Sequence, residues 1–473
     1  MGKSDIDLCE KNRDERPRVM IAAVSSGSGK TTVTCALLEA LKRRGHNPVS
    51  YKCGPDYIDP MFHRKVIEID SLNLDSYFMS EGEIIEDLNS YGGDISVIEG
   101  VMGIYDGLDM MTDRGSCYEI AGITNTPVIL VVNAAGSGRT IASVIKGVLS
   151  DDTKHLIRGI IINRISDNFY NRLLPYLEGK IAGIRDDVGI IGHIPDSNNI
   201  HINSRHLGLA LPQEIAGIRD IISKAADFIE ANCDVGKIVE ISQGAAKVQP
   251  IVQIKQTKSP DLKIAVASDE AFCFYYPQNI GFLKKIGFEP VFFSPLKDKR
   301  IPEGSDALLL GGGYPELHLE ELSRNTSMLE SIRSAISCGI PSLAECGGFM
   351  YLHNVIADKD GRQYKMAGVV DGMCSYSGHL VNFGYTQVAG YTGKSGEDLQ
   401  VDCSDWRAHI PGLRGHEFHY YESTCEGDDL LLRKASTDRE YRSMHAGKNY
   451  LWGFAHFYYP SAKDGIIRFL HGE

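Results

Sequence analysis

The glycine-rich segment GSGKTT, at residues 27 to 32, constrains the fold of this chain more than any other feature. An apolar run at 18–24 precedes it and an amphipathic stretch follows, which predicts a strand, a tight loop and a helix that begins near Gly29. Backbone N–H groups in such a loop face a phosphate, and the helix dipole adds positive charge there. Position 24, where glycine is usual, holds valine. We therefore predict an ATP site formed by Gly27, Ser28, Gly29, Lys30, Thr31 and Thr32.

Short apolar runs recur along the chain with helix-like stretches between them. Runs of this length suit parallel strands that are buried on both faces, and their alternation with helices predicts a doubly wound α/β sheet. A second series of apolar runs predicts another α/β domain. The expected strands are 18–24, 95–100, 127–133, 156–163 and 188–194 in the first series, and 262–268, 290–295, 306–313 and 340–346 in the second.

The length of 473 residues is too great for a single hydrophobic core. A polar stretch with two prolines separates the two series of strands, so we place a linker at 236–260. The expected domains are 18–235 and 261–473, preceded by a flexible tail at 1–17.

Composition excludes several classes of partner. A net charge of −13 is unfavourable for binding nucleic acid or an anionic membrane. No apolar run approaches the roughly 20 residues needed to span a bilayer, and residues 1–17 lack the apolar core of a signal peptide. Eleven cysteines without CxxC pairing indicate reduced thiols and a cytoplasmic location.

Four acidic residues lie in clusters that we expect near the phosphate loop. Glu99 ends the run ISVIEG, Asp106 follows it by seven residues, and Asp56 and Asp59 lie in the loop GPDYIDP. Carboxylates crowded together repel one another unless a cation such as Mg²⁺ neutralises them. The alternative for each aspartate is a turn-capping role.

Cys346 lies between an expected strand and an expected helix, in the segment AECGGFMYL. Small residues around a nucleophile permit a strained turn that exposes its sulfur, and we expect the helix dipole to lower the thiol pKa. Gly312 and Gly313 follow another strand and could donate oxyanion-hole amides. His456 is the candidate base, although such a histidine is often only a packed core residue. The usual third member of the catalytic triad, a glutamate two residues after the histidine, is absent, because Tyr458 occupies that position.

These segments together resemble the cobyrinic acid a,c-diamide synthase family. The resemblance covers about residues 18 to 460. It implies a dethiobiotin-synthetase-like P-loop domain followed by a class I glutamine amidotransferase domain that lacks the triad glutamate. It also implies ATP, Mg²⁺ and glutamine as reactants, and a tetrapyrrole substrate whose carboxylates become amides through an acyl phosphate. The phrases that carry it include KCGPDYIDPMFH, VIEGVMGIYDG, SRHLGL, LLLGGGYPE, AECGGFMYL and RGHEFHYYES.

The resemblance also assigns expected roles to single residues. Family members commonly read YLHLHF near the C-terminus, whereas this chain reads GFAHF, with Phe454 where one histidine would be; which of the two family histidines corresponds to His456 stays open. The expected catalytic residues are Cys346, His456, Asp56, Asp59, Glu99 and Asp106. The expected Mg²⁺ ligands are Thr31, Asp56 and Glu99. Among cations that could meet the substrate carboxylates, which include Lys52, His63 and Arg64, we favour Arg205 and His206.

Other readings stay open at this point. The same phrases match amidation of Ni-sirohydrochlorin in coenzyme F430 biosynthesis as well as amidation of cobyrinic acid. A reading from another class is a P-loop switch ATPase whose amidotransferase-like domain only binds; the intact AECGG segment opposes it. Sequence leaves undetermined the nucleotide preference, the order of the amidations and the oligomeric state, for which a homodimer is one possibility.

Overall fold

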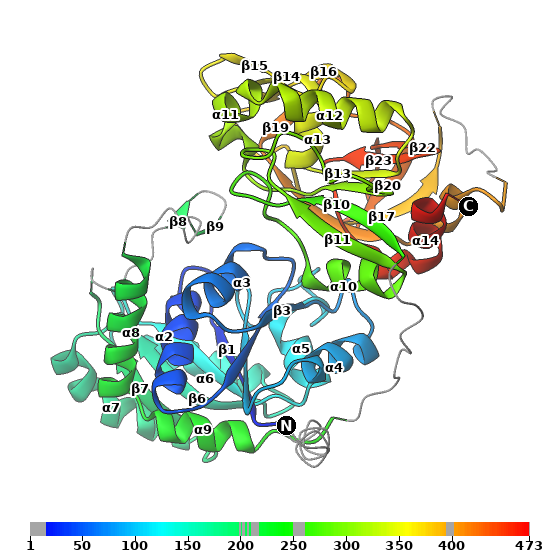
Figure 1. Ribbon diagram of the computed structural model, residues 1–473. Coiled ribbons are helices and arrows are strands. Elements are labelled where there is room, and N and C mark those ends of the chain that lie inside the picture. The colour runs from blue at the N-terminus through cyan, green and yellow to red at the C-terminus, as the bar shows by residue number, and fades with distance from the viewer. Residues whose placement is uncertain are drawn as a thin grey trace, which may run out of the picture. The chain divides into compact units, whose positions relative to one another are not determined.

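The computed structural model describes residues 16–197, 200, 204–205, 208–209, 217–248, 261–393 and 402–472. The chain divides into two compact units, Met1–Gln253 and Ile254–Glu473. Figure 1 colours the first unit blue to green and the second green to red. The predicted α/β class is confirmed in both units.

Seven parallel strands form the sheet of the first unit, in the order β3-β2-β4-β1-β5-β6-β7. Every residue of β1 and β2 is buried, as expected for strands covered on both faces. The apolar-run analysis missed β2 and β3, whose sequences PVSYKC and SLNL mix polar and apolar residues. The strands are β1 Arg18–Ala23, β2 Pro48–Cys53, β3 Ser71–Leu74, β4 Ile95–Glu99, β5 Val128–Asn133, β6 Ile157–Asn163 and β7 Gly189–Ile194.

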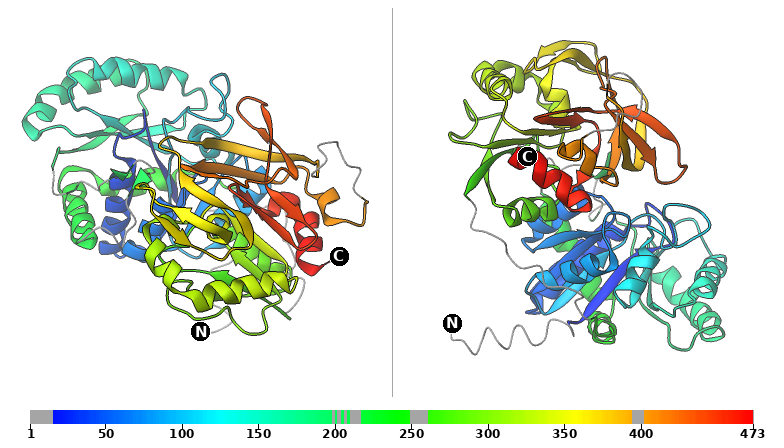
Figure 2. Two further views of the ribbon diagram at one scale, coloured as in Figure 1. Left: turned by 90° about the horizontal axis from the view of Figure 1, so that it is seen from above. Right: turned by 90° about the vertical axis from the view of Figure 1, so that its right-hand side faces the viewer.

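Helices pack against this sheet, and α2 and α8 run side by side in both Figure 1 and Figure 2. Helix α9 spans Val235–Gln243 and contacts strands β1, β6 and β7. The segment expected as a linker therefore begins within a packed helix of the first unit. Among the described residues, no helix combines the length and apolarity required to cross a membrane. The other helices of the unit are α2 Lys30–Arg43, α3 Ile58–Phe62, α4 Glu81–Ser90, α5 Cys117–Ile123, α6 Ile141–Asp151, α7 Asp167–Ala182 and α8 Ile218–Asn232.

The strand order places a ligand site at one edge of the sheet. Strand β1 pairs with β4 on one side and β5 on the other, while the chain that leaves β1 continues to β2 on the far side of β4. Ligands of open α/β sheets bind beyond the carboxyl ends of the strands, where the strand order reverses. The loop after β1, the end of β4 and the end of β2 meet at this point.

The second unit has a central six-stranded sheet, in the order β11-β10-β12-β13-β23-β22, in which only the pairing of β22 with β23 is antiparallel. Apolar clusters cover both faces, one containing Phe349 and Trp452 and the other Phe457 and Phe469. Its strands are β10 Leu262–Ala267, β11 Phe288–Phe293, β12 Ala307–Leu310, β13 Ser342–Glu345, β22 His445–Gly447 and β23 Tyr450–Gly453.

Helices follow β10, β12 and β13 in the second unit, whereas β11 leads directly to β12. The helices are α10 Pro277–Lys285, α11 Leu319–Arg324, α12 Thr326–Ser337, α13 Gly347–Leu352 and the C-terminal α14 Lys463–His471.

Two further sheets, which the apolar runs did not predict, lie between α13 and the C-terminus. One has the order β15-β14-β16-β19 and the other β21-β20-β17-β18-β24. All pairings in the second of these are antiparallel. Their strands are β14 His353–Ala357, β15 Gln363–Lys365, β16 Val370–Tyr376, β17 Asn382–Tyr391, β18 Arg414–His419, β19 Tyr421–Ser423, β20 Leu430–Lys434, β21 Glu440–Ser443 and β24 His456–Tyr458.

Candidate functional site

The segment GSGKTT forms the expected loop between β1 and α2. Gly27 and Gly29 have φ angles of 73° and 95°, in the left-handed region that favours glycine. A Cβ on Gly29 would also overlap the side-chain amide of Asn163. That amide donates a hydrogen bond of 2.8 Å to the carbonyl of Ser28. Asn163, at the end of β6, therefore fixes the shape of the loop.

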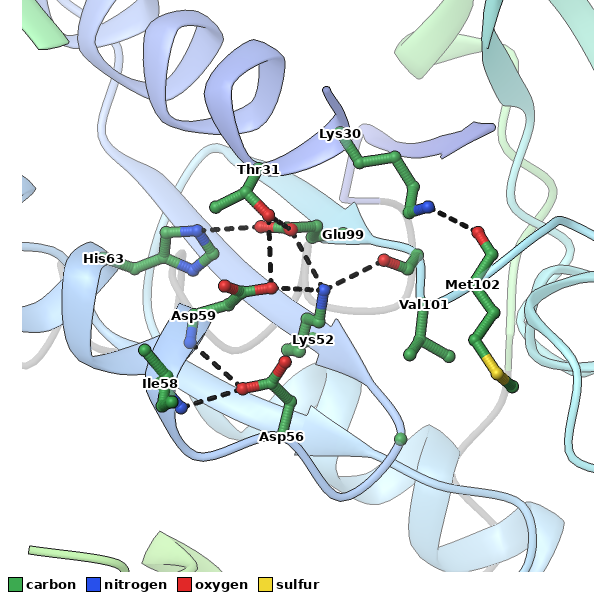
Figure 3. Close-up of polar contacts among 12 residues, drawn as sticks. Lys30, Thr31, Lys52, Asp56, Ile58, Asp59, His63, Glu99, Val101 and Met102 are labelled. Carbon is green, nitrogen blue, oxygen red and sulfur yellow. Dashed lines mark hydrogen bonds and ion pairs between the residues drawn. The ribbon is translucent and has the colours of Figure 1, made fainter. Parts of the chain in front are cut away.

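The first two residues of helix α2 point toward the end of β4 (Figure 3). The Lys30 ammonium contacts the carbonyls of Ser25, at 3.3 Å, and Met102. Burial lowers the pKa of Lys30. The Thr31 hydroxyl donates to Glu99 Oε1 at 2.6 Å. The phosphate-loop hydroxyl thus contacts a carboxylate at the carboxyl edge of the sheet, while the phosphate-loop lysine contacts the segment that follows that carboxylate.

A buried cluster of charged side chains surrounds that carboxylate. Lys52 Nζ lies 2.6 Å from Asp59 Oδ2 and 3.0 Å from Glu99 Oε1. His63 Nε2 lies 3.2 Å from Glu99 Oε2, and the Thr31 hydroxyl is 3.2 Å from Asp59 Oδ2. The five groups come from α2, β2, α3, the π-helix His63–Ile67 and β4. We call these five residues the acidic centre (Figure 3).

Charge in the acidic centre is unevenly balanced. Burial alone would raise the pKa of Glu99, but the Lys52 charge and hydrogen bonds from His63 and Thr31 bring it below its usual range. Burial and the neighbouring Asp56 raise the pKa of Asp59 well above its usual range. One ammonium therefore does not fully neutralise two buried carboxylates. Hydroxyl and carboxylate oxygens are the ligands that Mg²⁺ prefers, so this donor set fits that cation.

Magnesium usually takes only one or two protein carboxylates and completes its shell with phosphate oxygens and water. Within the described part of the chain, no three His, Cys, Asp or Glu side chains form a metal-binding group by themselves. Asp59, rather than the expected ligand Asp56, lies beside Thr31.

Asp56 and Asp106 hold turns near the acidic centre. One oxygen of Asp56 accepts hydrogen bonds from the amides of Ile58, at 2.8 Å, and Asp59, at 3.2 Å. Asp106 is exposed and accepts from the amide of Gly103 at 2.8 Å. Both aspartates thus show the turn-capping geometry that we considered as an alternative. Their carboxylates shape the loops that border the phosphate loop.

The two favoured substrate contacts cannot be located. Arg205 belongs to the two-residue strand β8 Ser204–Arg205, whose side chains lie outside the described residues, as does all of His206. Of the other cations, Lys52 and His63 are buried in the acidic centre. Arg64 donates to the carbonyl of Ser71 at 3.0 Å.

In the second unit, Cys346 occupies a strained turn between β13 and α13. Its φ of 47° and ψ of −106° are unusual for a residue with a side chain. Its amide donates to the carbonyl of Gly453 at 2.8 Å, which ties the turn to β23. A Cβ on Gly348 would overlap the carbonyl of Leu310. The small residues after the cysteine are therefore required by close packing on β12, as expected for a nucleophile elbow.

The glycines after β12 adjoin this turn. The Gly313 amide nitrogen lies 3.2 Å from where a Cβ on Gly347 would stand. The Gly312 carbonyl accepts hydrogen bonds of 3.0 Å from the amides of Cys273 and Phe274. These two bonds hold the Gly312 carbonyl away from the elbow. The N–H on the other side of the same peptide bond, which belongs to Gly313, therefore points toward the elbow. This geometry suits an oxyanion-hole donor at Gly313.

His456 begins β24 and its ring lies directly over Gly312, since a Cβ there would overlap the imidazole. The ring stacks on His416 with centroids 5.1 Å apart. Burial lowers the pKa of His456 to about 3, so the imidazole is neutral at pH 7. Phe454, by contrast, is fully buried and stacks on His419 at 4.0 Å. Of these two positions, only His456 adjoins the glycine loop.

The expected lowering of the Cys346 thiol pKa is wrong. Burial raises the pKa of this thiol, and Glu316 and Glu345 add to the increase, while the amide of Gly347 opposes it. Helix α13 has only six residues, and 8% of Cys346 is exposed. The thiol consequently needs a base to become a thiolate, which increases the importance of His456.

Sequence reasoning missed the roles of three residues that the structure places at these sites. They are Lys52, which joins the two carboxylates of the acidic centre; Asn163, which shapes the phosphate loop; and Glu345, which faces His456. Of these, Lys52 was named only as a possible contact for the substrate carboxylates, because strand β2, which brings it beside β4, was not predicted.

Comparison with protein families agrees with this division of the chain. The model described as "CobQ/CobB/MinD/ParA nucleotide binding domain" matches residues 19–209. The model described as "CobB/CobQ-like glutamine amidotransferase domain" matches residues 263–453. The predicted nucleotide-binding and amidotransferase domains are thereby confirmed.

Curated relatives cover nearly the whole chain. The cobyrinate a,c-diamide synthase of Priestia megaterium is 36% identical over 457 residues, which is 94% of each chain. This chain belongs to the cobyrinate a,c-diamide synthase family. Further relatives of the same name are those of Caldanaerobacter subterraneus subsp. tengcongensis, 35% identical over 95% of this chain and 97% of the relative, and Thermoplasma volcanium, 37% identical over 88% and 87%.

Membership of the cobyrinate a,c-diamide synthase family confirms the resemblance found in the sequence. It places the acidic centre in the nucleotide-binding domain of a synthase and Cys346 in its amidotransferase domain. Like the curated family members, the chain is a ligase that joins both domains in one polypeptide.

Proposed function

We propose that this chain converts the a- and c-side-chain carboxylates of cobyrinic acid to amides, with ATP and glutamine as cosubstrates. Support comes from the relatives of that name, which align over nearly the full length of both chains. It also comes from two sites of different chemistry in one polypeptide: a phosphate loop with an acidic centre, and a cysteine elbow. The first would activate a carboxylate and the second would supply nitrogen.

At the phosphate loop, ATP would transfer its γ-phosphoryl group to a substrate carboxylate, which gives an acyl phosphate. Lys30 would contact the β- and γ-phosphates, and the loop amides would hold the phosphate chain. Thr31, Glu99 and Asp59 would hold Mg²⁺, which supplies positive charge against the phosphate oxygens when bound. Positioning and charge neutralisation would account for most of the acceleration. Arg205 and His206 remain proposed contacts for the substrate's carboxylates.

At the elbow, His456 would take the proton of the Cys346 thiol, and the thiolate would attack the carboxamide carbon of glutamine. The Gly313 amide would stabilise the oxyanion. The C–N bond then breaks, ammonia leaves with the proton carried by His456, and water hydrolyses the thioester to glutamate. The ammonia would displace phosphate from the acyl phosphate and form the amide.

The strained geometry of Cys346 is the observation that carries this proposal. A φ of 47° costs free energy, on the order of 1–3 kcal/mol, and persists where the surrounding structure enforces it. Contacts from Gly348 to β12 and from Cys346 to β23 enforce it here. A domain used only for binding, as in the switch ATPase reading, would have no need of such an elbow.

Mass spectrometry of the product tests the proposal. Cobyrinic acid would be incubated with the enzyme, ATP, Mg²⁺ and glutamine labelled with heavy nitrogen at the amide. We expect two carboxylates to become labelled amides, with ATP consumed in step. Ni-sirohydrochlorin under the same conditions is the competing substrate. Preferential amidation of Ni-sirohydrochlorin would reassign the substrate, and ATP hydrolysis without amidation of either would support the switch ATPase reading.

A further inference from the structure

Glu345, the last residue of β13, lies beside His456. Its Oε2 is 3.9 Å from His456 Nδ1, and both side chains are buried. Its Oε1 accepts a hydrogen bond of 3.2 Å from the backbone amide of Phe457. The carboxylate is thus anchored to the strand that carries the histidine.

The register of the central sheet explains this proximity. Strand β13 is parallel to β23, and Glu345 pairs with Gly453 at the end of both strands. From Gly453 the chain needs only two residues to reach His456 at the start of β24. Glu345, which precedes the nucleophile, therefore lies at the same edge of the sheet as His456, the candidate base. The two residues are 111 positions apart in the sequence.

We propose that Glu345 is the carboxylate that positions His456, in place of the acid that is missing at Tyr458. The inference rests on the proposed glutaminase function of Cys346. By accepting the Nδ1–H of His456, Glu345 would select the tautomer whose Nε2 is free to take the thiol proton. It would also stabilise the imidazolium that forms in that step. At 3.9 Å the pair is an ion-pair contact, and such contacts commonly shorten when substrate binds.

The resting charges of the pair agree with this role. Burial raises the pKa of Glu345 to about 8 and lowers the pKa of His456 to about 3. Both groups are then neutral at pH 7. Transfer of the thiol proton would create positive charge on the imidazole next to Glu345. That positive charge would lower the pKa of Glu345, and the adjacent carboxyl oxygen would stabilise the imidazolium.

The titratable groups that face Glu345 come from several elements. The Tyr459 hydroxyl hydrogen-bonds to it, while Cys346 follows it in the chain. Tyr275 is close enough for Glu345 to affect its pKa, and its hydroxyl donates to the carbonyl of Ala267. His416 faces His456 from β18. Among these groups, Glu345 is the carboxyl group that lies within ion-pair distance of His456.

A purely structural role is the alternative, because Glu345 also accepts the Phe457 amide. Glu345→Gln separates the two roles, since its amide oxygen can still accept that hydrogen bond while its charge is lost. The measurement is glutaminase activity of the full chain against pH, with ammonia-driven amidation measured in parallel. Glu426→Gln is the matched control: Glu426 is another partly buried acid of this unit with a pKa raised by burial, and it accepts from Ser443 at 3.2 Å.

For Glu345→Gln we expect kcat with glutamine to fall about a thousandfold, by analogy with orienting acids of other triads. KM for glutamine and ammonia-driven amidation should stay within about twofold of wild type. Ionisation of Glu345 near pH 8 should raise the activity of the wild type, and this rise should be absent from the pH profile of the variant. Glu426→Gln should match wild type in all three measurements.

Wild-type kcat and an unchanged pH profile in Glu345→Gln would overturn the inference. If this variant fails to fold, Glu345→Asp decides instead: it keeps the charge but shortens the side chain, so kcat should fall about tenfold or more at an unchanged KM. An unaltered kcat in Glu345→Asp would also contradict the role. Absence of glutaminase activity in the wild type itself would instead disprove the proposed function of Cys346.

Discussion

The Thr31 hydroxyl donates a 2.6 Å hydrogen bond to Glu99, which is 68 residues further along the chain. This bond joins the phosphate loop after β1 to the end of β4, and it holds the Glu99 carboxylate against that loop. Activation of a carboxylate by ATP should therefore depend on Glu99, whereas glutamine hydrolysis in the other unit should not.

Glu99→Gln tests that division of labour. We expect amidation to fall at least about a hundredfold with either glutamine or ammonia as nitrogen source, because a carboxylate that would hold Mg²⁺ is lost. Glutaminase activity at Cys346 should remain within about twofold of wild type. Equal loss of both activities would show that the two sites are not chemically separate.

Lys52 should be essential for stability as well as for chemistry. Replacement by methionine leaves Asp59 and Glu99 buried without their shared cation, which should lower the free energy of unfolding by about 3–5 kcal/mol. Lys65→Met is the control, since Lys65 is exposed on the neighbouring π-helix and should change stability by less than about 0.5 kcal/mol. Urea unfolding followed by circular dichroism compares the two. A Lys52 variant as stable as the Lys65 variant would refute the described ion pairs.

The elbow should not tolerate a methyl group at Gly348. A Cβ at this position meets the carbonyl of Leu310, so Gly348→Ala should destabilise the second unit by about 1–3 kcal/mol and reduce glutaminase activity. Both tryptophans, Trp406 and Trp452, are buried in this unit, so their fluorescence reports its unfolding. Gly390→Ala, in β17 with open space around its Cβ position, should be nearly neutral. Equal unfolding midpoints for the two variants would argue against the packing of Gly348 on β12.

Acid should destabilise the second unit through His456. The folded state keeps this imidazole neutral down to about pH 3, whereas the unfolded chain takes up the proton near pH 6.5. The unfolded state thus binds more protons between these values, so stability falls as pH falls, by about 1.4 kcal/mol per pH unit. The variant His456→Asn should lack this contribution to the pH dependence of the free energy of unfolding. Tryptophan-detected urea unfolding at pH 7 and pH 5 measures it, and identical slopes in variant and wild type would contradict the neutral, buried state.

Sequence predicted the parts of the sites that lie in short, local patterns. The phosphate loop and the turn at Cys346 each depend on a strand, a few small residues and a helix that follow one another in the chain, and the structure has both. Apolar runs likewise predicted most of the buried parallel strands of the two central sheets, although not β2 and β3. They did not predict β17 or β18, because the sequences NFGYTQVAGY and RGHEFH mix polar residues and glycine with apolar residues.

Contacts set by strand register could not be predicted in the same way. Lys52 meets Glu99 because β2 pairs with β4, and Glu345 meets His456 because β13 ends beside the turn that leaves β23. Sequence reasoning sought the triad acid two residues after the histidine, where Tyr458 stands. The expected effect of the α13 dipole on the thiol failed for a different reason, since burial outweighs a helix of six residues.

The central claim is that nitrogen released at Cys346 reaches a carboxylate activated at the phosphate loop. Cys346→Ala, assayed with cobyrinic acid, ATP and Mg²⁺, tests it most directly. We expect amidation with glutamine to be abolished and amidation with a high concentration of ammonia to match the wild type. Undiminished use of glutamine by this variant, or loss of activity with ammonia in a variant that is still folded, would contradict the account.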